Sequence, residues 1–134
     1  MAMKLSRREV VGLGLSSLIL GCSASDEPSP GESMSRFGMH VKMAAHPGKR
    51  DELSDIMLKA SRLMSEANGC ELYIVHLSPD QPGTIWITEV WSSKEAHDAS
   101  LSVPGVQDLI LLARPLIAEM TPTLLQPLGG HGLD

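Results

Sequence analysis

The sequence predicts an α+β domain of the ferredoxin-like βαββαβ plan, in which helices cover one face of a four-stranded antiparallel sheet. Apolar residues at every second position indicate four strands, and apolar residues three and four positions apart indicate two helical regions. These segments follow one another in the order strand, helix, strand, strand, helix, strand. The chain has 134 residues, which is enough for one domain of this kind and too few for two.

The first strand and the first helix have clear periodicities. Residues 37–45 alternate between an apolar face and a face that carries His40 and Lys42, which is typical of a strand. Residues 49–66 place their apolar side chains on one face and predict an amphipathic helix. An Asn-Gly pair that ends at Gly69 then gives a stop and turn signal.

The second and third strands are joined by a short turn that contains proline and glycine. Residues 70–77 are apolar on both faces, so we expect this strand inside the sheet or against a partner. Residues 84–91 form the third strand, which the short turn makes antiparallel to the second. Trp86 and Trp91 are five positions apart on it, so their side chains lie on opposite faces.

The second helical region begins at a capping box, with a serine at Ser92 and a glutamate three residues later. A short helix to about Leu101 is followed by a helical piece over about 106–117, which Pro115 should bend. Residues 121–128 predict the last strand. Its two prolines lack an N–H donor, so we expect it at an edge of the sheet.

Helices on one side only leave the other face of the sheet in water unless something covers it. Because the second strand is apolar on both faces, this open face carries Tyr73, Val75 and Leu77 or their alternates. An exposed apolar sheet face predicts self-association. We therefore expect a homodimer that packs sheet face on sheet face.

The N-terminus has the character of an export signal. Residues 1–8 carry three basic side chains, and residues 10–20 form an uncharged apolar run that is too short to span a bilayer comfortably and of the right length for a signal peptide. The segment that ends at Cys22 resembles a bacterial lipobox. The Arg7-Arg8 pair resembles a twin-arginine export signal.

These features predict an exported lipoprotein anchored to a bacterial membrane on its periplasmic or other extracytoplasmic face. Residues 1–21 would be removed, Cys22 would carry lipid, residues 22–35 would be a flexible Ser/Pro/acidic linker, and residues 36–134 would form the domain. An uncleaved membrane anchor, or a wrongly assigned start ahead of a cytosolic protein, remains the alternative interpretation.

Charge and cysteine content exclude several classes of function. The formal net charge is −5; residues 1–21 hold three basic side chains and one acidic one, so their removal leaves about −7. Such a chain has no excess of lysine or arginine to meet phosphates, which argues against a nucleic-acid partner. With lipid on Cys22, Cys70 is alone, so we expect no disulfide, no metal site and no thiol catalysis.

Several short motifs occur in the order found in one known family. The matching segments are Pro47-Gly48-Lys49, Gly69-Cys70-Glu71-Leu72-Tyr73, Glu89-Val90-Trp91-Ser92-Ser93-Lys94-Glu95-Ala96, Val103-Pro104-Gly105-Val106 and Gly129-Gly130-His131-Gly132-Leu133. Together they make residues 36–133 resemble the antibiotic biosynthesis monooxygenase family, a set of small dimeric α+β barrel proteins.

The resemblance implies oxygenation of a quinol, an anthrone or a similar electron-rich ring without metal or flavin. We therefore expect no cofactor. Many members of the family carry a histidine nine residues after the tryptophan of the third strand, where this chain has Ser100, with His97 one helical turn earlier. The haem-degrading branch uses an asparagine on the first strand and a histidine in the second helix. The helical piece over 106–117 has no histidine and the first strand has no asparagine, which argues against haem chemistry.

A cofactor-free oxygenase needs a base whose pKa lies near the working pH, and histidine is the usual choice. His76 and His97 are the candidates, and Glu89 could orient a base or the substrate. Each also has a structural interpretation. His76 at a strand end could face solvent or a dimer seam, His97 could face water, and Glu89 could form a cross-strand charge pair.

The candidate substrate-binding residues are aromatic and methionine side chains. Trp91 and Trp86 could form an aromatic wall for a planar ligand, Tyr73 could donate a hydrogen bond to a phenolate, and Met39 could line the pocket. The alternative for the tryptophans is core packing, which a chain with 3% aromatic residues would need. Tyr73 could instead anchor the sheet.

Three functions therefore remain open. The first is a cofactor-independent monooxygenase of a quinol-like or polycyclic phenolic small molecule. The second is a non-catalytic dimeric module that binds or senses a small hydrophobic ligand, which Ser100 in place of the usual histidine favours. The third is a structural or interaction protein without a pocket.

Overall fold

The computed structural model describes residues 36–133. In this part of the chain the elements are β1 (Phe37–Ala45), α4 (Arg50–Met64), β2 (Cys70–Leu77), β3 (Thr84–Trp91), α5 (Lys94–Ser100), α6 (Val106–Ala113), a 3-10 turn (Arg114–Leu116) and β4 (Ile117–Leu125). The expected α+β order is confirmed. The predicted signal at 1–21, the lipid site at Cys22 and the linker at 22–35 lie outside the described residues.

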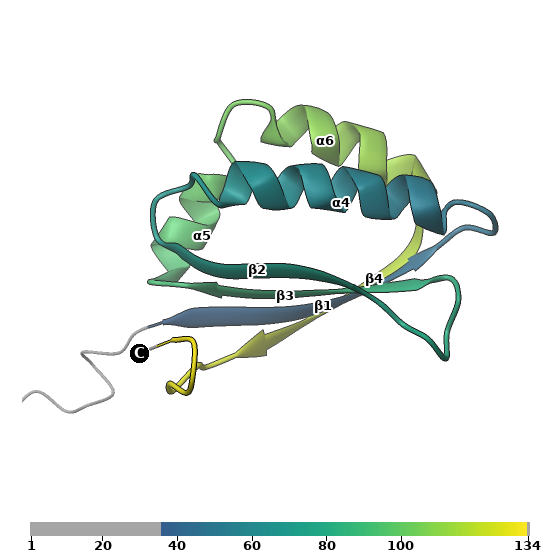
Figure 1. Ribbon diagram of the computed structural model, residues 1–134. Helices are drawn as coiled ribbons and strands as arrows, with labels where there is room; N and C mark the ends of the chain where they lie inside the picture. Colours follow the sequence, from purple (N-terminus) through teal and green to yellow (C-terminus); the bar gives the residue numbers. More distant parts are fainter. Residues whose placement is uncertain (1–35, 134) are drawn as a thin grey trace, which may run out of the picture. The chain divides into compact units, whose positions relative to one another are not determined.

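The four strands form one antiparallel sheet in the order β2-β3-β1-β4. Helices α4 and α6 lie side by side over one face of this sheet, and α5 covers one end of it (Figure 1). Met39 of β1 pairs with Glu89 of β3, which pairs with Tyr73 of β2. Because side chains alternate along a strand, the odd-numbered residues of these three strands face the helices.

The core fills the space between this face and the helices. It is built from aliphatic side chains and methionine, as the low aromatic content requires. The buried residues are Val41, Met43, Leu53, Ile56, Met57, Ile85, Ile87, Ala113 and Leu116, with a second cluster of Met64, Trp91 and Val106. Trp91 and Leu53 are fully buried.

The end of the second helical region differs from the expectation. Helix α6 ends at Ala113, and Ile117 is the first residue of β4 rather than the last of a helix. Pro115 lies in the 3-10 turn between them, so it ends the helix instead of bending it, because proline cannot donate the next helical hydrogen bond. The last strand therefore begins four residues before the expected 121–128 and ends before Pro127.

Two further expectations need correction. Strand β2 lies at an edge of the sheet, so of its two expected places the one inside the sheet is wrong and the one against a partner stays a prediction; β4 does lie at the predicted other edge. The cap of α5 is Ser93, whose Oγ accepts a hydrogen bond from the backbone N–H of Ala96 at 3.1 Å. The third residue after this cap is an alanine, so α5 has a simple cap rather than the box expected from Ser92.

Gly69 fixes the approach of β2 to α5. Its φ of +88° lies in the left-handed region, which a glycine adopts without a Cβ penalty. A Cβ at this position would lie 2.6 Å from the Cβ of Ala96 on α5. This close approach sets where α5 sits over the end of the sheet.

Helix α4 is the longest in the described part of the chain, with 15 residues. Within residues 36–133 no helix combines the length and the apolar character needed to cross a bilayer.

Candidate active site

A cavity of about 150 Å³ lies between the helix-facing side of the sheet and the helices. Its wall is mostly apolar, and its polar members are Tyr73, Glu89, His97 and Ser100. The apolar residues that line it are Met43, Met57, Ala60, Met64, Leu101, Val106, Leu109 and Ile110. A larger hollow of about 500 Å³ lies between the loops around Pro47 and Pro82, but it is more open and its lining is more polar, so we place the candidate site in the smaller, mostly apolar cavity.

Glu89 brings a carboxyl group into this apolar wall. It is 8% exposed, and its Oε2 accepts a hydrogen bond of 2.7 Å from the indole N–H of Trp91. The two residues are two positions apart on β3, so the period of the strand puts them on one face. Burial raises the pKa of the Glu89 carboxyl above its usual range, and the Trp91 hydrogen bond and nearby His97 partly offset this rise.

His97 reaches the same point from α5. Its Nε2 lies 4.0 Å from Oε2 of Glu89, and its Nδ1 lies 3.0 Å from Oδ1 of Asp98. The imidazole is flanked by two aromatic rings, Phe37 at 5.0 Å and Trp91 at 5.7 Å between centroids. Its side chain is 17% exposed, so it lies at the boundary between pocket and solvent rather than in open water.

Ser100 lines the pocket one helical turn after His97. Residues three apart on a helix share a face, so both side chains reach the cavity. The Oγ of Ser100 donates a hydrogen bond of 2.6 Å to the backbone carbonyl of His97. An imidazole is therefore present at this wall, supplied by His97 one turn earlier than the position where the resemblance places it.

Tyr73 and Met39 flank Glu89 on the helix-facing side of the sheet. Tyr73 lines the cavity, and burial and the nearby Glu89 carboxylate raise the pKa of its phenol, so it remains a hydrogen-bond donor at neutral pH. Met39 packs against the core beside Glu89. Burial likewise raises the pKa of the Cys70 thiol, which keeps it protonated.

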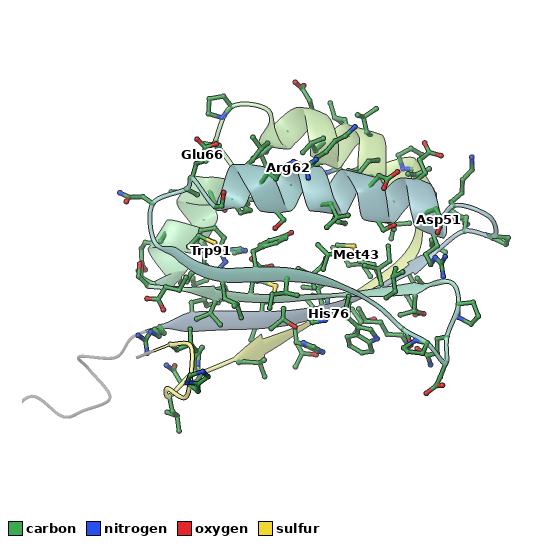
Figure 2. The ribbon with its side chains drawn as sticks, in the orientation of Figure 1. Met43, Asp51, Arg62, Glu66, His76 and Trp91 are labelled. Carbon is green, nitrogen blue, oxygen red and sulfur yellow. The ribbon has the colours of Figure 1, made fainter. Side chains whose placement is uncertain are left out.

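His76 and Trp86 lie on the opposite face of the sheet. Figure 2 shows His76 on the side away from the helices, and Trp91 and Met43 between sheet and helices. Nε2 of His76 lies 3.1 Å from Oγ1 of Thr88, which lies 3.2 Å from Nδ1 of His40, and the His40 ring stacks on Trp86 at 4.8 Å. These residues form a row across the outer face, apart from the cavity.

The structure therefore brings together four of the predicted site residues, namely Tyr73, Glu89, Trp91 and His97. It also adds Asp98 and Phe37, which contact His97 and which sequence reasoning did not select. The sequence signal for Asp98 is its position next to His97 on a capped helix. Phe37 had no such signal, because its contact depends on the register of β1 with β3.

The described residues offer no ready site for a metal ion. Among residues 36–133 there is no group of three or more His, Cys, Asp or Glu side chains placed to hold one.

Comparison with known proteins identifies relatives of the whole domain. The model of the antibiotic biosynthesis monooxygenase family matches residues 36–110. A candidate antibiotic biosynthesis monooxygenase from Chloroflexus aurantiacus J-10-fl is 46% identical over 75% of this chain and 100% of that chain, with a TM-score of 0.69. No curated protein matches the chain.

More distant structures share the fold. A mutant of SnoaB, a cofactor-independent oxygenase from Streptomyces nogalater, has a TM-score of 0.64 at 14% identity, over 72% of this chain and 97% of that chain. Rv0793 from Mycobacterium tuberculosis has a TM-score of 0.65 at 20% identity, over 72% of this chain and 99% of that chain. At these identities the likeness is one of fold alone.

Proposed function

The chain belongs to the antibiotic biosynthesis monooxygenase family, and from this premise we propose that it is a cofactor-independent monooxygenase of a quinol-like small molecule. The supporting observation is the pair formed by Glu89 and His97 at the polar end of an otherwise apolar cavity. Their 4.0 Å separation is too long for a hydrogen bond between them. A hydroxyl oxygen at about 2.8 Å from each side chain fits between the two.

This arrangement suits a phenolic hydroxyl group. His97 removes its proton through Nε2, and the carboxyl of Glu89, whose protonated form burial favours, donates a hydrogen bond to the same oxygen atom. The apolar wall excludes water, which strengthens these interactions and admits dioxygen to the resulting electron-rich ring. One atom of dioxygen enters the ring, and the other leaves as water with two hydrogen atoms of the substrate, so that a hydroquinone becomes a hydroxyquinone.

The size of the cavity narrows the substrate class. An engineered cavity of about 150 Å³ in another protein binds benzene, and the cavity here has about the same volume. A single-ring hydroquinone is therefore the better fit, and a polycyclic phenol or anthrone would need a wider pocket.

Oxygen uptake tests this proposal. The protein is supplied with a panel of single-ring hydroquinones and anthrones, and the His97→Gln variant serves as the matched control. We expect uptake above the buffer rate with at least one hydroquinone, and a loss of about 10²–10⁴-fold in His97→Gln, the usual contribution of a general base. Uptake equal to buffer with every compound would contradict the proposal.

The second candidate function is a non-catalytic module that binds a small hydrophobic ligand. The observation that favours it is Ser100, which lines the cavity where many family members carry histidine. A ring ligand that binds without oxygen uptake, together with activity gained in Ser100→His, would support this function over the first. The cavity itself argues against a purely structural role.

We also propose that the domain is a homodimer formed by its outer sheet faces. Ile74 is 42% exposed there, and Leu72 and Trp86 lie on the same face, too apolar an area for a surface in water. Sedimentation of residues 36–134 tests it. A dimer is expected at tens of micromolar, and a monomer at that concentration would remove the proposal.

Finally, we propose that the protein is exported and anchored through lipid on Cys22. The support is the N-terminal sequence alone. Fractionation of cells that express the full chain should find it in the membrane fraction, and Cys22→Ser should release it. Equal release of both proteins would contradict the anchor.

A further inference from the structure

The imidazole of His97 lies between two carboxyl groups of different surroundings. Its Nε2 faces Glu89, whose side chain is 9% exposed, and its Nδ1 faces Asp98, whose side chain is 52% exposed. The ring therefore connects the pocket on one edge with solvent on the other. Phe37 and Trp91 pack against it and restrict its rotation.

Asp98 is held in place by a second bond. Its Oδ2 accepts a hydrogen bond of 2.7 Å from Nζ of Lys94, one turn earlier on α5, while its Oδ1 meets Nδ1 of His97 at 3.0 Å. The hydrogen bond from Lys94, and to a smaller extent the one with His97, lowers the pKa of the Asp98 carboxyl, so it is ionised at neutral pH. An ionised carboxylate only accepts hydrogen bonds, so the proton of a neutral His97 must be on Nδ1.

We propose that Asp98 is a positioning residue, which keeps the proton of neutral His97 on Nδ1 and so leaves the lone pair of Nε2 directed at Glu89 and the pocket. With the other tautomer, Nε2 would carry a proton and could not take one from a substrate hydroxyl. Lys94, Asp98, His97 and Glu89 then form a row from solvent into the cavity. The proton that His97 accepts at Nε2 then passes to the reduced oxygen atom that leaves as water, which restores the Nδ1–H tautomer for the next turnover.

The catalytic consequence rests on the proposed function, but the tautomer does not. Nitrogen-15 NMR of His97 in the full chain, without substrate, reports which ring nitrogen carries the proton. Asp98→Ala removes the acceptor of Nδ1–H. Lys94→Ala is the matched control, because it breaks the same Lys94–Asp98 pair on the same exposed helix face but keeps the Asp98 carboxylate that meets Nδ1 of His97.

We expect Nδ1–H in the unmodified protein and in Lys94→Ala, and a shift toward Nε2–H in Asp98→Ala. An unchanged tautomer in Asp98→Ala would overturn the inference, as would an equal shift in both variants, which would indicate a distorted helix. With a hydroquinone that is turned over, kcat of Asp98→Ala should fall at least about tenfold with little change in KM. Absence of turnover would count against the proposed function alone, because the tautomer is read without substrate.

Discussion

At Glu89 a carboxyl group lies in an apolar wall, with the indole of Trp91 as its hydrogen-bond donor. Burial disfavours its charged form, so the folded protein holds the proton more tightly than the unfolded chain does. Loss of this proton as pH rises therefore costs the folded protein more than the unfolded chain. The role proposed for Glu89 thus lowers stability, as is common at active sites.

The pH dependence of stability follows from this shift. Because the folded pKa is raised, Glu89 favours the fold only where the carboxyl is protonated, and this effect is lost as pH rises above the usual range of a glutamate. We expect Glu89→Gln to be more stable than the unmodified protein at pH 7 and equal to it near pH 3. Urea unfolding at both pH values checks this, and a variant less stable at pH 7 would contradict it.

Trp91 should matter for stability more than Trp86, although both lie on β3. Trp91→Phe leaves the buried Glu89 carboxyl without its indole donor, which costs about 1–3 kcal/mol, and it also removes packing volume from a fully buried site. Trp86→Phe is the matched control, because Trp86 stacks on His40 at the outer face. The measurement is the free energy of unfolding of each variant in denaturant, and equal losses would contradict this account.

At the scale of elements, the periodicity of apolar residues predicted those strands and helices whose bounds depend on local sequence. Strands β1, β2 and β3, helix α4 and the start of α5 lie within a few residues of their expected places. The boundary between α6 and β4 was not predicted correctly. Residues 109–120 are apolar enough for a helix or a strand, and only packing on the sheet decides between the two. The edge position of β2 could not be predicted either. Apolar residues on both faces indicate that both faces are buried, but they do not show how many neighbouring strands pair with β2.

The candidate site could likewise be predicted only in part from the sequence. The period of a strand is enough to put Glu89 and Trp91 on one face, and helical spacing is enough to put His97 and Ser100 on another. That these two faces meet depends on the register of β1, β2 and β3 and on the close approach of α5 to the sheet. The contact between His97 and Asp98 depends on side-chain rotamers, which a single sequence does not specify.

The close approach of β2 to α5 can be measured with two glycines. Gly69→Ala places a Cβ 2.6 Å from that of Ala96 and at a positive φ, whereas Gly48→Ala at φ +79° has nothing within 4 Å. We expect Gly48→Ala to lose about 1–2 kcal/mol from the left-handed backbone alone, and Gly69→Ala to lose clearly more. Thermal unfolding of both checks this. Equal losses would mean that α5 moves away freely.

At the scale of the whole molecule, the outer sheet face is the surface that a single domain leaves uncovered. It carries the row of His76, Thr88 and His40, the Trp86 ring and the apolar residues of β2. β4 adds a second uncovered surface, because Met120, Leu124 and Leu125 are each about half exposed or more. The outer face is the surface that the proposed dimer would bury, whereas Met120 and Leu124 pair with Met43 and Met39 and so lie on the helix-facing side of the sheet.

Two lysine substitutions, one on the outer sheet face and one on the helix side, test which surface forms the dimer. Ile74→Lys on the outer face should convert the dimer to a monomer, because two lysines would be buried near each other. Leu58→Lys on α4 is the control, since Leu58 is similarly exposed at 45%. Sedimentation should show a monomer for the first variant and a dimer for the second. A dimer for both would place the interface elsewhere.

The most direct test of the central claim, that the Glu89–His97 pair serves a cofactor-free monooxygenase, is turnover of a hydroquinone under ¹⁸O₂ with metals removed by chelation. Mass spectrometry of the product should find one ¹⁸O atom in the hydroxyquinone, formed at a rate that falls by about 10²–10⁴-fold in His97→Gln and also falls in Glu89→Gln. A product whose added oxygen comes from water, or that forms equally fast in both variants, would contradict the claim.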